Sequence, residues 1–298
     1  MSRLVLRPAC LRRGDARALA NALITRLEGE GDMSSLDAWI AVAETGSAWL
    51  TPTITAPSLV QKLWRLRFFT QTLELSTLNL IEQVVSATGC PFIDVGAHVG
   101  YFSITATAAG ARSVTAIEMH PANWRLLQAN VPSAVTMNAA AGQVAGEREY
   151  FLGAGHSNHS LIQRGDTSDV RASIPVVTLD DVLTIDARQS HLIKIDVQGY
   201  ETSVLRGYQN GLTAEGPILV FEVERNDDGP GLDAIYEDAL ALLIGYEYRL
   251  FWIGEDQLVE IHGTADTFLR SIPKSSNILA VASSRFAAFD AALHQRRV

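Results

Sequence analysis

Short apolar runs of strand length alternate with helical segments from residue 91 onward, and this alternation strongly limits the folds open to the chain. Five runs are predicted as strands: residues 91–95, 113–117, 134–138, 191–196 and 218–223. Four intervening segments are predicted as helices: residues 101–109, 121–130, 200–206 and 231–244. Strict alternation is typical of a mostly parallel sheet with helices on both faces. We therefore predict an α/β fold with a doubly wound sheet, in which ligands bind beyond the carboxyl ends of the strands.

The first 88 residues have a different pattern, without this alternation. Apolar residues at Ala16, Leu19, Leu23 and Leu27 recur three or four positions apart, which predicts one face of a helix. We predict a helical N-terminal segment over residues 1–88 and a second domain over residues 89–298. The segment either covers the ligand site or mediates dimerisation, and the sequence does not choose between these roles.

Two later regions complete the predicted domain. Glycines interrupt a β-like pattern between residues 147 and 177, which predicts an inserted hairpin or flap. Residues 246–252 and 277–281 are predicted as two late strands.

Composition restricts the partners. The sequence has 24 Lys and Arg against 33 Asp and Glu, a formal net charge of −9, so it offers no broad basic surface for a phosphate backbone. Its apolar runs are far shorter than the roughly 18 residues of a membrane-spanning helix. The only cysteines, Cys10 and Cys90, form no Cys-x-x-Cys pair, which argues against a thiolate zinc site and a disulfide framework. We expect a cytoplasmic protein that binds neither nucleic acid nor membranes.

A predicted strand followed by a glycine-flanked turn is the most informative local pattern. Residues 92–103 read Phe-Ile-Asp-Val-Gly-Ala-His-Val-Gly-Tyr-Phe-Ser, with Asp94 at the strand end and a helix that begins near Tyr101. Gly96 and Gly100 flank the turn. Because Gly96 has no Cβ, we expect a nucleoside to approach its backbone closely, and Gly96→Val to block the nucleoside while leaving the fold largely intact. Asp94 can order the loop and attract an ammonium group, and amides at the helix start face the ligand.

The next two strands end in polar residues that fit the same ligand. Glu118 follows Gly96 by 22 residues, about where a dinucleotide fold places an acid on the ribose hydroxyls. Asn138 ends the third strand, and we expect its amide to approach the adenine edge. Three successive strand ends that agree with one ligand favour a nucleoside site over ordinary polar strand ends. A nicotinamide dinucleotide is disfavoured, because the Gly-x-Gly-x-x-Gly spacing is absent and Asp94 would repel a pyrophosphate.

The later half of the chain resembles a known family. Residues 178–183, Thr-Leu-Asp-Asp-Val-Leu, and 191–207, His-Leu-Ile-Lys-Ile-Asp-Val-Gln-Gly-Tyr-Glu-Thr-Ser-Val-Leu-Arg-Gly, closely resemble the FkbM family of methyltransferases. Residues 92–103, 118–121 and 277–280 also look like that family. The resemblance implies a Rossmann-like fold that binds S-adenosylmethionine and, usually, O-methylation of a sugar or natural-product hydroxyl. Family members commonly have Glu at the position of Gln198, so the chain departs from the family there.

We therefore predict an S-adenosylmethionine-dependent methyltransferase that acts on a small-molecule or glycan hydroxyl. The candidate donor-binding residues are Asp94, Gly96, Ala97, His98, Gly100, Tyr101, Glu118, Met119, Asn138 and Ala139. Two other functions are kept as alternatives. One is an S-adenosylmethionine-binding or interaction protein that has lost catalysis, for which Gln198 is a hint. The other is an NAD-dependent dehydrogenase, which the glycine spacing disfavours.

Asp196 is the candidate catalytic residue. It ends the strand expected beside the first one, and Lys194 points to the same face two residues earlier. A carboxylate at this place can accept the hydroxyl proton as charge develops during methyl transfer. The structural alternative is that Asp196 caps the following helix or only pairs with Lys194. Asp196 and Glu222 are also oxygen ligands suited to magnesium, but two acids do not make a coordination sphere, so we favour a bare carboxylate and assign no metal ligand.

Overall fold

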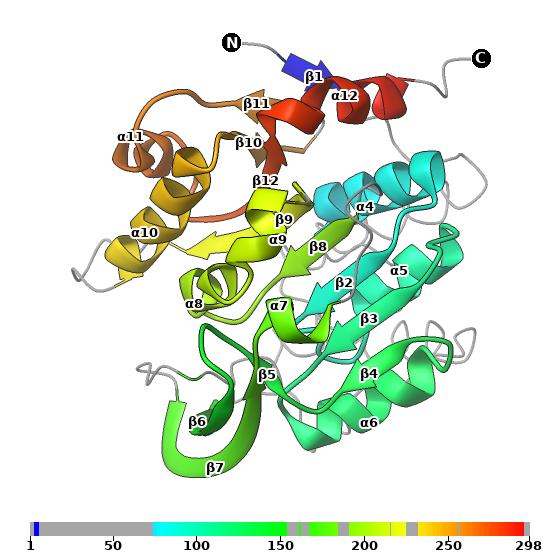
Figure 1. Ribbon diagram of the computed structural model, residues 1–298, viewed down its shortest axis with the longest axis vertical. Coiled ribbons are helices and arrows are strands. Elements are labelled where there is room, and N and C mark those ends of the chain that lie inside the picture. Colours follow the sequence, from blue (N-terminus) through cyan, green and yellow to red (C-terminus); the bar gives the residue numbers. More distant parts are fainter. Residues whose placement is uncertain are drawn as a thin grey trace, which may run out of the picture.

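The computed structural model describes residues 3–5, 74–153, 161, 167–183, 191–214, 216–224, 232–255 and 257–294. The helix predicted from Ala16 to Leu27 lies outside these residues. A nine-stranded sheet in the order β1-β11-β10-β12-β9-β8-β2-β3-β4 forms the centre of the molecule (Figure 1). Its strands are β1 (Arg3–Val5), β2 (Phe92–Val95), β3 (Val114–Ile117), β4 (Val135–Met137), β8 (Leu192–Ile195), β9 (Ile218–Glu224), β10 (Tyr248–Ile253), β11 (Gln257–Glu260) and β12 (Ser275–Ala282).

The sheet is mostly parallel. Strands β9, β8, β2, β3 and β4 are parallel neighbours. Strand β12 runs antiparallel between β9 and β10, and β11 runs antiparallel between β10 and β1. All strands of this sheet except β11 and β12 therefore point in one direction, which confirms the predicted Rossmann-like α/β architecture.

Helices cover both faces of the sheet (Figure 1). One apolar cluster joins the sheet to α4, α5, α6 and α12, and a second joins its other face to α7, α8, α9, α10 and α11. The helices are α4 (Leu75–Thr88), α5 (Tyr101–Ala108), α6 (Pro121–Asn130), α7 (Leu179–Val182), α8 (Glu201–Arg206), α9 (Gln209–Ala214), α10 (Leu232–Gly245), α11 (Ala265–Arg270) and α12 (Phe286–His294). Within the described part of the chain, no helix has both the length and the apolar character needed to cross a membrane.

The first parallel strand shows why apolar runs become the centre of the sheet. All four residues of β2 are buried. Phe92 packs with the cluster of α4 and α5, whereas Ile93 and Val95 pack with the cluster of α8 and α10. Side chains alternate between the two faces of a strand, so a strand buried on both faces needs apolar residues at nearly every position. The one charged residue of β2, Asp94, is buried near its carboxyl end.

The predicted inserted hairpin is confirmed. Strands β6 (Gly146–Gly153) and β7 (Thr167–Val177) pair antiparallel, and β5 (Ala140–Ala141) pairs with β7 to complete a separate three-stranded sheet. Tyr150 of β6 and Val176 of β7 are buried in its small apolar cluster, with Met119 packed against it. The hairpin thus lies next to the segment that follows β3.

The N-terminal region differs from a purely helical segment at one place among the described residues. Residues Arg3–Val5 form strand β1, because they pair with β11 at the edge of the sheet. Helix α4 is helical as predicted and ends at Thr88. The following Gly89 has φ 60°, and its amide donates to the carbonyl of Val85. Leu78, Ile81 and other residues of α4 are fully buried in the main core. Helix α4 therefore packs as part of the same core as the sheet.

Candidate functional site

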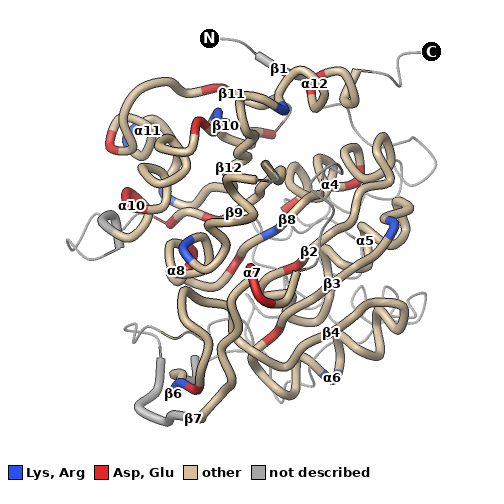
Figure 2. The backbone as a smooth tube through the Cα atoms, viewed as in Figure 1, with Lys and Arg blue, Asp and Glu red and all other residues tan. Residues whose placement is uncertain are grey.

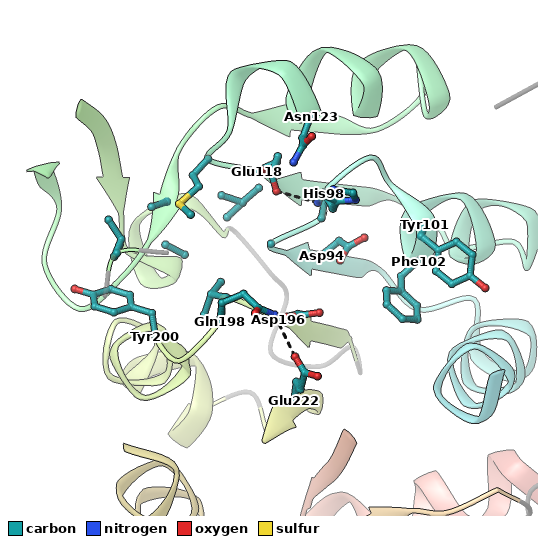
Figure 3. A pocket seen from close by; sticks show the side chains of 18 of the residues that line it. Asp94, His98, Tyr101, Phe102, Glu118, Asn123, Asp196, Gln198, Tyr200 and Glu222 are labelled. Carbon is teal, nitrogen blue, oxygen red and sulfur yellow. Dashed lines mark hydrogen bonds between the residues drawn. The ribbon is translucent and has the colours of Figure 1, made fainter. Parts of the chain in front are cut away.

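A cavity of about 320 Å³ opens beyond the carboxyl ends of β2, β3, β8 and β9 (Figure 3). This is the edge at which a doubly wound sheet binds its ligand. Eight of the ten predicted donor-binding residues line the cavity, together with Asp196: Asp94, Gly96, Ala97, His98, Tyr101, Glu118, Met119 and Ala139. The predicted residues Gly100 and Asn138 are not among those that line it.

The turn after β2 depends on backbone conformations that glycine adopts easily. Gly96 has φ 80°, His98 has φ 52° and Gly100 has φ 93°. A Cβ at Gly96 would lie 1.8 Å from the backbone oxygen of Asp196. Glycine is therefore required because the turn packs against the end of β8. This corrects the expectation that Gly96→Val would act only on the nucleoside, since the clash is with the protein backbone.

Gly100 has a packing role as well. It precedes α5, and a Cβ there would lie 2.9 Å from a side-chain carbon of Leu127 on α6. Gly100 lets α5 and α6 pack closely, behind the cavity wall. The glycine is therefore needed for helix packing and does not itself face the ligand.

Asp94 is buried at the base of the turn. The hydroxyl of Ser103 donates a hydrogen bond to Asp94 Oδ2 at 2.6 Å. Burial raises the pKa of Asp94 to about 6, although the Ser103 bond and the charge of Lys194 act in the opposite direction. Asp94 is therefore mostly ionised at neutral pH and offers a negative charge to the cavity.

Glu118 is oriented by two backbone amides. The amide of His98 donates to Oε2 at 2.9 Å (Figure 3). The amide of His120 donates to Oε1 at 2.8 Å. Each carboxylate oxygen keeps further acceptor capacity for a ligand. Burial raises the pKa of Glu118 to about 7, against the effect of both amide bonds. The carboxyl group is thus fixed in place and titrates close to neutral pH.

Asn138 holds the backbone behind Glu118. Its side-chain nitrogen donates to the carbonyl of Glu118 at 3.0 Å and to the carbonyl of Met119 at 2.9 Å. Both amide hydrogens are used in these bonds. The structure therefore gives Asn138 a supporting position, not the predicted one at the adenine edge, and the neighbouring Ala139 lines the cavity instead.

Asp196 lies on the opposite wall and is bonded through both oxygens. Lys194 Nζ lies 3.3 Å from Oδ2, and the side-chain nitrogen of Gln198 donates to Oδ1 at 2.9 Å. The same Gln198 nitrogen donates to Glu222 Oε2 on β9 at 3.3 Å. Lys194 is fully buried, with Nζ 5.0 Å from the centre of the Phe102 ring, whereas a quarter of the Asp196 side-chain surface is exposed. Asp196 thus reaches the cavity while Lys194 stays beneath it.

The two neighbouring carboxyl groups differ in proton affinity. Burial acts to raise the pKa of Asp196, but Lys194 and the Gln198 hydrogen bond lower it below the ordinary value. Burial, followed by the charge of Asp196, raises the pKa of Glu222 to about 9. At neutral pH Asp196 is ionised and Glu222 is protonated, which is the arrangement expected of two acids that share one site. Figure 2 shows the acidic and basic residues along these strands.

Sequence reasoning did not select Glu74. This residue precedes α4, has a left-handed backbone with φ 45°, and lines the cavity. The side-chain amide of Asn277 on β12 donates to Glu74 Oε2 at 2.7 Å. Nothing in its local sequence distinguishes Glu74 from a surface acid. The only signal was indirect: residues 277–280, which include its partner Asn277, resemble the family named above.

The loop after β8 is ordered by Glu201. Its Oε1 accepts hydrogen bonds from the backbone amides of Val197 at 3.1 Å and Gly199 at 3.3 Å. Gln198, between them, has φ 55°. The loop therefore presents the Gln198 side chain toward Asp196 and Glu222.

Among the described residues, no three His, Cys, Asp or Glu side chains are grouped so as to hold a metal ion.

A family model described as the methyltransferase FkbM domain matches residues 94–250. A search of curated proteins finds no match. Among solved structures, an O-methyltransferase from Bacillus cereus in complex with SAH is similar at 12% identity and a TM-score of 0.41, over 90% of this chain and 100% of that one. A precorrin-6y C5,15-methyltransferase from Geobacter metallireducens is similar at 14% identity and a TM-score of 0.38, over 70% of this chain and 86% of that one.

Proposed function

The chain belongs to the FkbM methyltransferase family and is an S-adenosylmethionine-dependent methyltransferase, and we propose that it methylates a hydroxyl group of a sugar, glycan or natural product. The observation that carries this proposal is the position of Asp196, an ionised carboxylate on the same cavity as the predicted donor-binding turn. The donor and the acceptor would then meet between β2 and β8.

The residues of the donor side suit S-adenosylmethionine. Asp94 offers a charge for the ammonium of the methionine part, and Glu118 offers acceptor oxygens for the ribose hydroxyls. Met119 and Ala139 supply apolar wall beside Glu118, where we place the adenine. When bound, the donor supplies a methyl group on a positively charged sulfur. The acidic wall of the cavity favours that charge.

The charges of the cavity wall support a neutral or cationic acceptor. No described Lys or Arg lines the cavity. Six carboxyl groups do: Glu74, Asp94, Glu118, Asp196, Glu222 and Glu224. An acceptor with a phosphate or carboxylate would meet like charge at Asp94 and Asp196, which are ionised at neutral pH. A sugar or polyol instead supplies hydroxyl donors that carboxyl oxygens accept.

Asp196 would assist the transfer as a proton acceptor. The acceptor oxygen forms a bond to the methyl carbon while the carbon–sulfur bond breaks, with its electron pair left on sulfur. The hydroxyl proton passes to Asp196, which is ionised because Lys194 and Gln198 lower its pKa. A carboxylate with a low pKa is a weak base, so much of the acceleration would come from alignment of the two reactants, for which effective molarities reach about 10⁵ M or more.

The proposal is tested with the purified chain, methyl-labelled S-adenosylmethionine and a panel of sugars, glycosides and hydroxylated natural products. Label recovered as an ether on one class of acceptor supports it. Label recovered on nitrogen or carbon, or only on phosphorylated or carboxylated compounds, contradicts it.

Calorimetry separates the two alternative functions from the proposal. Tight binding of S-adenosylhomocysteine without turnover on any hydroxylated acceptor would favour a non-catalytic binding protein. Binding of NAD in place of S-adenosylhomocysteine would favour a dehydrogenase.

Two roles remain predicted for the N-terminal segment, dimerisation and covering of the site. The position of Glu74 on the cavity wall supports the covering role.

A further inference from the structure

Gln198 joins Asp196 and Glu222, the two acids of the cavity wall opposite the turn after β2, which we call the acceptor wall. Its single side-chain nitrogen lies 2.9 Å from Asp196 Oδ1 and 3.3 Å from Glu222 Oε2. The ionised Asp196 can only accept hydrogen bonds, so the amide must face it with its NH₂ group. One residue therefore uses its two amide hydrogens on two carboxyl groups, one directly after β8 and one on β9 (Figure 3).

The two carboxyl groups that meet at this amide could supply part of the ligand set of a divalent cation. Magnesium and manganese are bound by oxygen atoms, commonly carboxylates, at about 2.1 Å for magnesium. Here the side-chain nitrogen of Gln198 lies within hydrogen-bond distance of one oxygen of each carboxyl group, and both distances are too long for metal bonds.

The other carboxyl oxygens of Asp196 and Glu222 also have partners within the protein. Lys194 Nζ lies 3.3 Å from Asp196 Oδ2 and is fully buried, so its charge cannot move into solvent. The hydroxyl of Ser275 donates to Glu222 Oε1 at 3.3 Å. A cation entering here would displace the amide and meet the fixed positive charge of Lys194.

We infer that Gln198 is a positioning residue whose amide occupies the place of a divalent cation between Asp196 and Glu222, so that this acid pair is held without a metal. The identity of residue 198 then decides whether the site takes a cation. A carboxylate there removes the amide donor and supplies a third oxygen ligand group. The inference about the cation does not depend on the proposed function. Only its consequence does, namely that methyl transfer needs no metal.

Manganese titration of the full-length chain, followed by electron paramagnetic resonance without donor or acceptor, tests this inference. The variants are Gln198→Glu, which adds the carboxylate, and Gln198→Met, which has similar length and no hydrogen-bond donor. We expect Gln198→Glu to bind Mn²⁺ at one saturable site, roughly tenfold or more tighter than the wild type, because ligand charge sets affinity for hard cations. Mg²⁺ should displace it. Wild type and Gln198→Met should bind Mn²⁺ at least roughly tenfold more weakly.

The double variant Gln198→Glu/Glu222→Gln locates the site, because it keeps the new carboxylate but removes one ligand and should lose the binding. Far-ultraviolet circular dichroism confirms that each variant is folded. A wild type that binds Mn²⁺ as tightly as Gln198→Glu overturns the inference, and so does a folded Gln198→Glu that gains no site. Neither outcome depends on finding the acceptor, so failure of this inference is distinguishable from failure of the methyltransferase proposal.

Discussion

Gly96 and Asp196 are in direct backbone contact: a Cβ built on Gly96 would lie 1.8 Å from the carbonyl oxygen of Asp196. The turn on the donor side and the strand that bears the candidate proton acceptor are thus fixed against each other. If the donor and the acceptor bind as proposed, main-chain packing rather than flexible side chains would set the separation between them.

The first prediction follows from this contact. Gly96→Ala should lower the free energy of unfolding by about 2 to 4 kcal/mol, from overpacking against backbone together with a positive φ. It should also weaken binding of S-adenosylhomocysteine. Urea denaturation and calorimetry measure the two effects. Gly110→Ala is the matched control, because Gly110 has φ 91° but nothing within 4 Å of its Cβ position. Equal losses in both variants would mean that the Asp196 contact is unimportant.

A second prediction distinguishes the two acids of the acceptor wall. Asp196→Asn should leave folding and donor affinity intact and lower turnover by about 10² to 10⁴, the usual contribution of positioned proton transfer. Glu222→Gln should retain most of the turnover, because the amide imitates the protonated carboxyl group that a pKa of about 9 implies. Steady-state kinetics with the acceptor found by screening check this. If Asp196→Asn turns over at nearly the wild-type rate, Asp196 is only structural.

A third prediction concerns stability and pH. The pKa of Glu222 is raised from an ordinary value of 4.5 to about 9 in the folded protein, so the folded state holds a proton that the unfolded state has released over this interval. The resulting stabilisation is present below about pH 4.5 and is lost as the pH rises toward 9. The free energy of unfolding should therefore decline more steeply between these values in the wild type than in Glu222→Gln. Parallel declines, measured by urea denaturation at several pH values, would contradict the assignment.

A fourth prediction concerns the donor. Glu118 must be ionised for both its oxygens to accept hydrogen bonds, and its pKa is about 7. Affinity for S-adenosylhomocysteine should accordingly rise as the pH increases from about 6 to 8. Glu118→Gln should weaken binding by about 1.5 to 3 kcal/mol at the upper end and lose this pH dependence, as measured by calorimetry. Asp94→Asn is the control, because Asp94 titrates lower, near 6. An unchanged pH dependence in Glu118→Gln would assign the titration elsewhere.

Local sequence was enough to predict the elements that are buried on both faces. Strands β2, β8 and β9 are mostly apolar runs because helices cover them on each side, and this produces a strong pattern. Strand β11 was not predicted. Its four residues, Gln257–Glu260, are a short edge segment defined by pairing with β10 and β1, which local composition does not encode.

The site was predictable to the same extent. Asp94 lies near the end of β2, and Glu118 and Asp196 directly follow β3 and β8. Parallel strands bring such ends together, so their meeting could be inferred. The bonds of Asn138 and the bridge made by Gln198 could not, because each depends on side-chain directions set by tertiary packing. Glu74 was missed for a related reason, since its position depends on a partner far along the chain.

That long separation has a consequence for how the protein is made. Asn277 follows Glu74 by 203 residues, and it lies on the last strand of the sheet. During synthesis the early part of the chain emerges first, yet the acceptor wall stays incomplete until β12 has left the ribosome and inserted between β9 and β10. A nascent chain that stops before β12 therefore lacks the bond that holds Glu74, and the finished site depends on the C-terminal strand being translated.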